Sequence, residues 1–133
     1  MVVEKVESIM TTVVACATPD YRLEELEKVM EGHNIRCLPI IEDDGRCIGV
    51  VTPIDILHWH RLQNDARKAQ AKDIFTWPVI SVEPQLSVTA AIELMISRNI
   101  HHLIVERQGE LIGILSAMDF LEYFHLKEKV SNA

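Results

Sequence analysis

The apolar residues of this chain follow two spacings that alternate along its length. Between positions 23 and 30 they recur every three or four residues, and charged side chains fill the positions between them, which predicts an amphipathic helix. The stretches 37–41 and 47–51 are instead short apolar runs separated by an acidic, glycine-containing turn. Such a pattern predicts a strand hairpin, and Gly45 suits the positive φ of its turn.

The same succession of elements returns in the second half of the chain. Apolar positions from 88 to 96 predict a helix with Ser87 as its N-cap, and the runs 102–105 and 111–115 predict a second hairpin with Gly109 in its turn. Short extended runs at 12–16 and 78–82 precede the two helices, and further helices start near Pro53 and Ala117. Each half therefore reads as β-α-β-β-α, and the fold class is α+β.

Residue identities show that the two halves are an internal repeat. A shift of 65 residues places Pro19 on Pro84, and a shift of 64 after the hairpin turn places Asp55 on Asp119. We expect a first repeat over residues 4–62, a connector over 63–71, a second repeat over 72–127 and a tail over 128–133. One repeat is too small to bury a good core alone, so the chain is expected to form one compact module.

Composition excludes several classes of function. The formal net charge is −7 and no Lys/Arg block is present, so a nucleic-acid partner is not expected. No apolar run is long enough to span a bilayer and no signal peptide is recognisable. The three cysteines are odd in number and form no CxxC, which predicts reduced thiols in the cytoplasm, without disulfides or a metal site. No motif of a catalytic site is present, so no enzyme is expected.

Chemistry is concentrated where a strand runs into a helix in each half. Thr52 and Asp55 stand there in the first half, and Ser116 and Asp119 in the second. A hydroxyl and free N–H groups at a helix start suit a phosphate, and an Asp one turn on can accept hydrogen bonds from ribose hydroxyls. The same Ser/Thr-x-x-Asp spacing is also that of a capping box. The residues alone leave both interpretations open, and both roles can coexist.

Three segments, each present twice and in the same order, resemble a tandem CBS-domain pair, or Bateman module. The resemblance covers about residues 4–126, and its segments are 7–11 and 72–76, 34–40 and 99–105, and 49–55 and 113–119. It implies two repeats packed with pseudo-twofold symmetry, two related clefts between them, and a disk-like homodimer. It also implies a non-catalytic regulatory module that binds an adenine nucleotide or related adenosyl ligand.

The resemblance implies further site residues. Nucleotide-binding members carry basic residues facing phosphate at the start of the second strand, where this chain has Arg36, His101 and His102, while Cys37 departs from the pattern. An adenine pocket would be lined from the first strands, at Cys16, Ile80 and Ser81. Each of these residues could instead be an ordinary strand-start or core residue. The ligands implied are AMP, ADP, ATP, NAD or S-adenosylmethionine, with no covalent cofactor.

Two functions of different classes remain open. In the first, the module senses an adenosyl ligand and shifts between conformations when the ligand binds. In the second, the repeats form a structural protein that acts through dimerisation or an unidentified protein target, and the Ser/Thr-x-x-Asp segments only cap helices. Stabilisation by an added nucleotide would separate the two.

Overall fold

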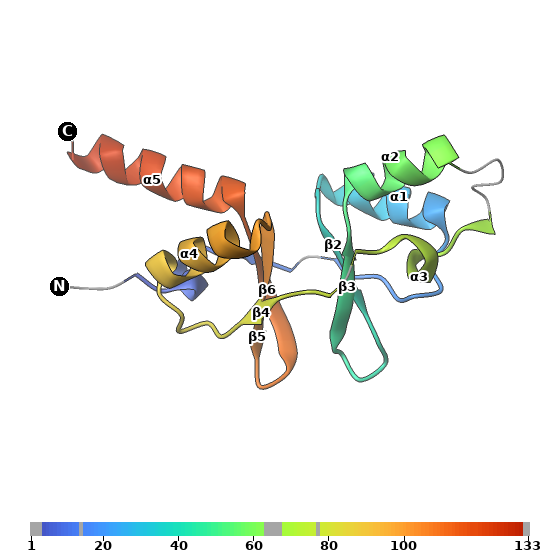
Figure 1. Cartoon of the computed structure of the whole chain (residues 1–133), viewed down its shortest axis with the longest axis horizontal. Coiled ribbons are helices and arrows are strands. Elements are labelled where there is room, and N and C mark those ends of the chain that lie inside the picture. Colours follow the sequence, from blue (N-terminus) through green and yellow to red (C-terminus); the bar gives the residue numbers. More distant parts are fainter. Residues whose placement is uncertain (1–3, 14, 63–67, 77, 132–133) are drawn as a thin grey trace. The chain divides into compact units, whose positions relative to one another are not determined.

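A computed structural model describes residues 4–13, 15–62, 68–76 and 78–131. The chain forms two compact units (Figure 1), which we name the central unit, residues 14–79, and the terminal unit, residues 1–13 with 80–133. Each unit has a hydrophobic core of its own. Val14, in the first predicted strand, and residues 63–67 of the predicted connector lie outside the described residues, as do residues 132 and 133 of the tail.

The central unit places three helices and a strand hairpin around an aliphatic core. Leu26, Leu38 and Ile40 are completely buried in it. The first helix begins where the Glu25 carboxylate accepts a hydrogen bond from the Arg22 N–H and ends at Asn34, whose φ of 53° is left-handed. The elements are α1 (Leu23–His33), β2 (Leu38–Ile41), β3 (Cys47–Val51), α2 (Pro53–Leu62) and the short α3 (Ala71–Ile74).

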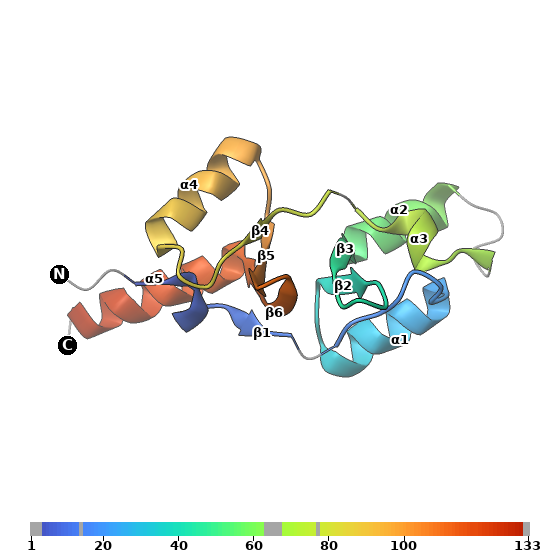
Figure 2. The ribbon, with the colours of Figure 1, turned by 90° about the horizontal axis from the view of Figure 1, so that it is seen from below.

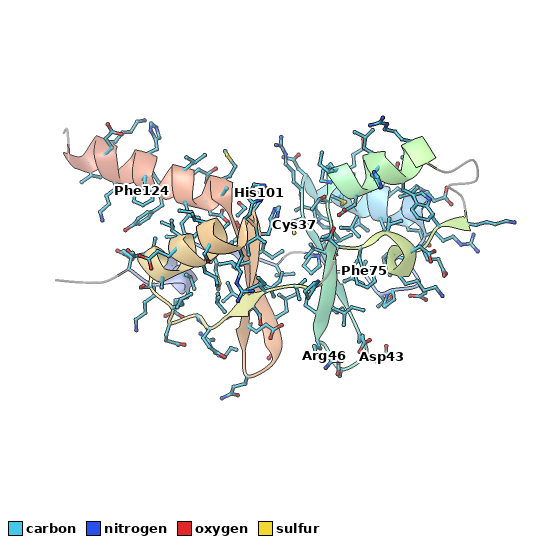
Figure 3. All side chains as sticks on the ribbon, viewed as in Figure 1. Cys37, Asp43, Arg46, Phe75, His101 and Phe124 are labelled. Carbon is cyan, nitrogen blue, oxygen red and sulfur yellow. The ribbon has the colours of Figure 1, made fainter. Side chains whose placement is uncertain are left out.

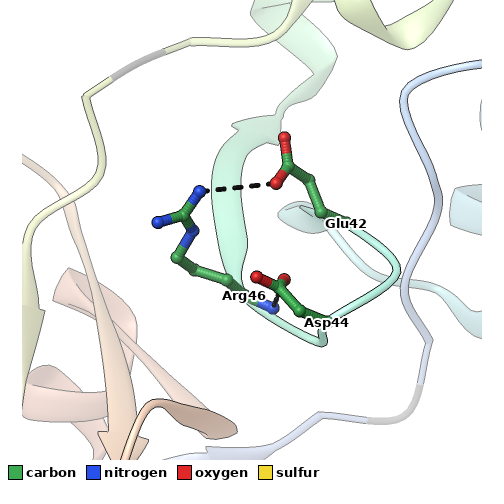
Figure 4. A network of polar contacts seen from close by, with 3 residues as sticks. All are labelled: Glu42, Asp44 and Arg46. Carbon is green, nitrogen blue, oxygen red and sulfur yellow. Dashed lines mark hydrogen bonds and ion pairs between the residues drawn. The ribbon is translucent and has the colours of Figure 1, made fainter.

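Polar contacts close the turn between β2 and β3 (Figure 4). The Arg46 N–H donates to Asp44 Oδ1 at 2.9 Å, and the Arg46 guanidinium lies 3.4 Å from Glu42 Oε2. Gly45 adopts a φ of 84°, as the predicted hairpin requires. These groups are exposed, so the ion pair adds little to stability.

The terminal unit is built around a sheet of strand order β1-β6-β5-β4, in which β4 is parallel to β5 and the other pairs are antiparallel. Figure 2 shows these strands beside α4 and α5 from a second direction. The predicted Ser87 cap is confirmed, since its hydroxyl accepts from the Ala90 N–H at 3.1 Å. The elements are η1 (Val6–Ser8), β1 (Thr11–Thr12), β4 (Ser81–Val82), α4 (Val88–Arg98), β5 (His102–Arg107), β6 (Glu110–Ser116) and α5 (Ala117–Ser131).

The segments that precede the first predicted strands differ most from expectation. We name residues 4–12 and 69–76 the leaders. The expected strands at 12–16 and 78–82 were too long, because among the residues described there the strands cover only Thr11–Thr12 and Ser81–Val82. The first leader pairs with β6 of the second repeat, and the second leader packs its Ala71 and Ile74 into the core of the central unit. Each unit therefore contains the leader with which the other repeat begins.

Candidate functional site

In the central unit, Thr52 connects the end of β3 to the start of α2. The Thr52 N–H and hydroxyl donate to Asp55 Oδ2 at 2.8 and 3.0 Å. In return, the Asp55 N–H lies 3.4 Å from the Thr52 hydroxyl oxygen. Both side chains are half-buried. The Ser/Thr-x-x-Asp segment thus forms a capping box that satisfies donors at the start of α2.

The terminal unit repeats this arrangement between β6 and α5. The Ser116 N–H and hydroxyl donate to Asp119 Oδ2 at 2.8 and 3.2 Å, and the Asp119 N–H lies 3.3 Å from the Ser116 hydroxyl. The interpretation of these residues as helix caps is correct for both units. In each unit the second carboxylate oxygen of the aspartate, Oδ1, takes no part in the capping box.

A leader threonine contacts that remaining oxygen in both units. Thr76 Oγ1 donates to Asp55 Oδ1 at 2.8 Å, and Thr11 Oγ1 donates to Asp119 Oδ1 at 3.0 Å. Sequence reasoning placed both threonines in the leader motif but gave neither a role at the site. The only signal that could have found them is their equivalent position, one at the end of each motif.

Within the terminal unit, the predicted histidines adjoin the Ser116–Asp119 pair. His102 lies opposite Ser116 in the β5–β6 register, and the His101 carbonyl accepts from the Ala117 N–H at 3.2 Å. The His101 side chain is exposed and that of His102 is half-buried. Figure 3 shows His101 at the end of the hairpin from which α5 starts.

The two predicted residues of the first strand reach the same end of this sheet. The Ile80 carbonyl accepts from the Ile104 N–H at 3.0 Å, and Ser81 lies opposite Ile104. Ile80 is half-buried and Ser81 is exposed. Because β4 runs parallel to β5, these residues and the histidines lie near the strand starts, where β6 ends at Ser116.

In the central unit, the predicted residues Arg36 and Cys16 also lie near the strand starts. Arg36 is exposed and precedes β2, and Cys16 is half-buried and precedes Ala17, which pairs with Ile40 of β2. Arg36 therefore lies two residues before β2, and Cys16 lies next to the residue that bridges to it. Their side chains make no ion pair or metal cluster among the described residues.

Cys37 replaces the basic residue expected next to Arg36, and it lies close to the carboxylate of the central site. Burial raises the pKa of the Cys37 thiol to about 12, with smaller contributions from Cys47 and Asp55. Burial also raises the pKa of Cys16. None of the three cysteines forms a disulfide with another described residue. Because its thiol stays neutral at physiological pH, Cys37 supplies no charge for binding an anion.

The two sites can accept hydrogen bonds and offer a limited set of donors. An ionised carboxylate has roughly four lone-pair positions. Asp55 and Asp119 each receive three protein donors, which leaves acceptor capacity on Oδ1 for a ligand hydroxyl. Donors at the helix starts are fewer than in an ideal helix, because Pro53 lacks an N–H and the Ala117 N–H is bonded to His101.

In the part of the chain that the structure describes, no group of three or more His, Cys, Asp or Glu side chains is arranged to hold a metal ion. No helix in these ranges is both long and apolar enough to cross a membrane.

Known proteins resemble the chain over most of its length. It is 27% identical over 121 residues to inosine-5'-monophosphate dehydrogenase of Methanocaldococcus jannaschii, covering 90% of this chain but only 23% of that enzyme. The chain CBSX2, solved in complex with AMP, superimposes with a TM-score of 0.78 at 20% identity, covering 94% of this chain and 98% of that one. The CBS domain pair of protein MJ0100, solved with 5'-methylthioadenosine and S-adenosyl-L-methionine, gives a TM-score of 0.85 at 24% identity, covering 95% and 99%.

At these identities the solved structures establish the fold alone. The family itself is established by sequence, because the CBS domain matches twice, over residues 6–61 and 71–126. These ranges include both Ser/Thr-x-x-Asp segments and most of both leaders. The resemblance seen in the sequence motifs is thereby confirmed, and the chain belongs to the CBS-domain family and carries two CBS domains.

Proposed function

We propose that this chain is a non-catalytic regulatory module that binds an adenosine ligand at its Ser/Thr-x-x-Asp sites. The candidates are AMP, ADP, ATP, NAD and S-adenosylmethionine. The observation that carries the proposal is the recurrence of one geometry in two units: a half-buried carboxylate at a helix start, with acceptor capacity on Oδ1. The adenosine ligands named for CBSX2 and MJ0100 support the choice of ligand class.

The proposed roles follow from the chemistry of each group. Asp119 accepts a hydrogen bond from a ribose hydroxyl, which a charged acceptor binds about twice as strongly as a neutral one. Ser116 and the neighbouring His101 and His102 serve phosphate or another anionic group. Ile80 and Ser81 line the side of the base.

The central unit is proposed as the weaker anion site. Thr52 and Asp55 repeat the hydroxyl and the carboxylate, and Arg36 supplies a positive charge. Cys37 stands where the terminal unit has a histidine, and its raised pKa keeps it neutral. A ligand with fewer negative charges therefore suits this unit better, and Cys16 is its proposed base-side residue.

Regulation requires that the ligand bind one conformation better than another. We propose that ligand binding at these sites shifts such an equilibrium, which an unidentified target protein senses. Three cysteines without a disulfide among the described residues support a reducing compartment such as the cytoplasm as the place of action.

A second candidate function, assembly, is favoured by apolar side chains that the two post-hairpin helices leave exposed. On α2, Ile54 and Leu57 are 71% and 56% exposed, and on α5, Met118 and Leu121 are 57% and 63% exposed. On each helix the two side chains are three residues apart and so share one face, and exposed apolar patches of this kind mark interaction sites. We propose that these helices form a homodimer interface. Assembly would be the whole function if no ligand binds.

Thermal unfolding with each of the five ligands tests the proposal. A ligand at 100 times its dissociation constant stabilises the folded state by about 2.7 kcal/mol, which raises Tm by several degrees. Asp119→Asn should retain the fold and lose most of the shift. If none of the five ligands moves Tm, the assembly function replaces the sensor.

A further inference from the structure

Both candidate carboxylates are held by a threonine whose own backbone is fixed. Thr76 exchanges two backbone hydrogen bonds with Val50, its N–H donating at 2.8 Å and its carbonyl accepting at 3.1 Å. In the terminal unit, Thr11 is the register partner of Ile114 in the β1–β6 pair. Val50 and Ile114 each follow the repeat's equivalent strand glycine. The same strand position thus anchors the threonine in both units.

The residue before each threonine adds a second anchor. Phe75 covers Gly49 so closely that a Cβ on the glycine would lie 1.8 Å from the ring, and Met10 covers Gly113 with its sulfur 2.4 Å from such a Cβ. The glycines therefore let the leader lie against the strand. A leader held at two successive residues presents its threonine hydroxyl at a fixed place.

These contacts fix both oxygens of each carboxylate. The capping box holds Oδ2, and the leader threonine holds Oδ1. Rotation about the last torsion of an aspartate is otherwise broad. With both oxygens bonded, the remaining lone pair of Oδ1 points in one direction before any ligand arrives. Binding of a ligand hydroxyl then carries no further entropy cost for ordering this side chain.

We propose that Thr11 and Thr76 are positioning residues that orient Asp119 and Asp55 toward the ribose hydroxyls of the bound ligand. This inference rests on the proposed function. Each site is then completed by the leader of the other repeat, so a single repeat without that leader lacks the orienting hydroxyl. The threonines act through the carboxylate, so their effect is confined to ligands that carry a ribose hydroxyl.

Isothermal titration with AMP and with S-adenosylmethionine tests this role. The variants are Thr11→Val and Thr76→Val, which replace the hydroxyl by a methyl of similar shape, and Thr11→Ser and Thr76→Ser, which keep it. Thr12→Val is the matched control, because Thr12 is exposed in the same strand and its side chain points to the opposite face. Circular dichroism melts check that each variant is folded.

Affinity should fall about ten-fold in a valine variant, as expected for losing a hydrogen bond to a charged group. The serine variants and Thr12→Val should bind as the wild type does. The affinity for 2',3'-dideoxy-AMP, which lacks both ribose hydroxyls, should not change in the valine variants. Loss of AMP and dideoxy-AMP binding in equal proportion would indicate a merely structural threonine and would overturn the inference.

Two further results separate this inference from the proposed function. If the wild-type protein binds AMP or S-adenosylmethionine and both valine variants bind it equally or more tightly, the positioning role is wrong and the proposed function stands. If the wild type binds neither ligand nor any other of the five candidates, the proposed function fails and the positioning role fails with it.

Discussion

Thr76 donates a 2.8 Å hydrogen bond to Asp55, although Thr76 lies in the leader that opens the second repeat and Asp55 lies in α2 of the first. The equivalent bond in the terminal unit joins Thr11 to Asp119 across 108 residues of sequence. The two CBS domains thus exchange their leaders, and each exchange ends on the carboxylate proposed to bind ribose. The stability of each leader and the chemistry of each site are therefore linked.

Removing a capping carboxylate should cost stability without unfolding the protein. Asp119→Ala deletes the acceptor for Ser116 and Thr11, so we expect the free energy of unfolding to fall by about 1–2 kcal/mol. Asp119→Asn should cost less because its side-chain oxygen still accepts. Urea denaturation measures both. Glu122→Ala, on an exposed position of α5, is the control and should lie within about 0.5 kcal/mol of wild type. If Asp119→Ala is unfolded, the capping box is required for folding and does not merely stabilise the start of α5.

The strand glycines should differ in their tolerance of a methyl group. Gly49→Ala forces the rigid Phe75 ring out of its place and should destabilise the protein by about 1–3 kcal/mol. Gly113→Ala meets the end of Met10, a flexible side chain that can move aside, and should cost less.

Gly32→Ala is the control for the glycine series. Gly32 lies within α1 and nothing approaches its Cβ position within 4 Å, so alanine there should stabilise the protein by about 0.5–1 kcal/mol. Equal costs at Gly49 and Gly113 in urea denaturation would contradict the packing of the leaders described above.

The Cys37 thiol should be unreactive in the folded protein. Its pKa is raised from 9.0 to about 12, and the thiolate is the reactive form. At pH 8, iodoacetamide should modify Cys37 slowly in the native state and rapidly in concentrated urea, as peptide mass spectrometry would show. Fast native modification of Cys37 would contradict its burial beside Asp55.

The same shift predicts a loss of stability at alkaline pH. The thiol is neutral in both folded and unfolded states below about pH 9, so its contribution to folding is complete there. As pH rises from 9.0 toward 12, the unfolded thiol ionises first, and stability falls. Cys37→Ala should flatten this part of the pH profile of the unfolding free energy. A profile unchanged by the substitution would show that other groups cause the alkaline slope.

The exposed apolar face of α5 should govern self-association. Leu121→Glu places a charge among side chains that are more than half exposed, and a homodimer formed through this face should dissociate to monomers. Size-exclusion chromatography with light scattering measures the mass. Lys129→Glu changes charge on the same helix and should leave the mass unaltered. If the wild type is already a monomer, or if Leu121→Glu stays dimeric, this face is not the interface.

The sequence predicted those parts of the fold that depend on neighbouring residues. The helices from Leu23 and Val88 and the two hairpins follow from apolar spacing and turn glycines. The capping residues Ser87 and Ser116 were also readable, because a cap and its partner lie three residues apart. Local signals of this kind were sufficient for the α+β class and the repeat.

The parts that depend on distant contacts were not predictable in this way. The first predicted strands shrank to two residues each, and the first of them pairs with β6, about 100 residues away. The contact of Thr11 with Asp119 and the packing of Met10 on Gly113 are both long-range, and no spacing within one segment reveals them. Cys37, which departs from the basic pattern, is half-buried and has a raised pKa to which Asp55 contributes.

Calorimetric titration of wild type and Asp119→Asn with AMP and S-adenosylmethionine is the sharpest test of adenosine binding at the Ser116–Asp119 site. We expect the wild type to bind at least one of the two ligands. Asp119→Asn should lose ten-fold or more in affinity while its circular dichroism spectrum stays like that of the wild type. Binding of equal strength by both proteins, or by neither, would show that this site does not bind the ligand.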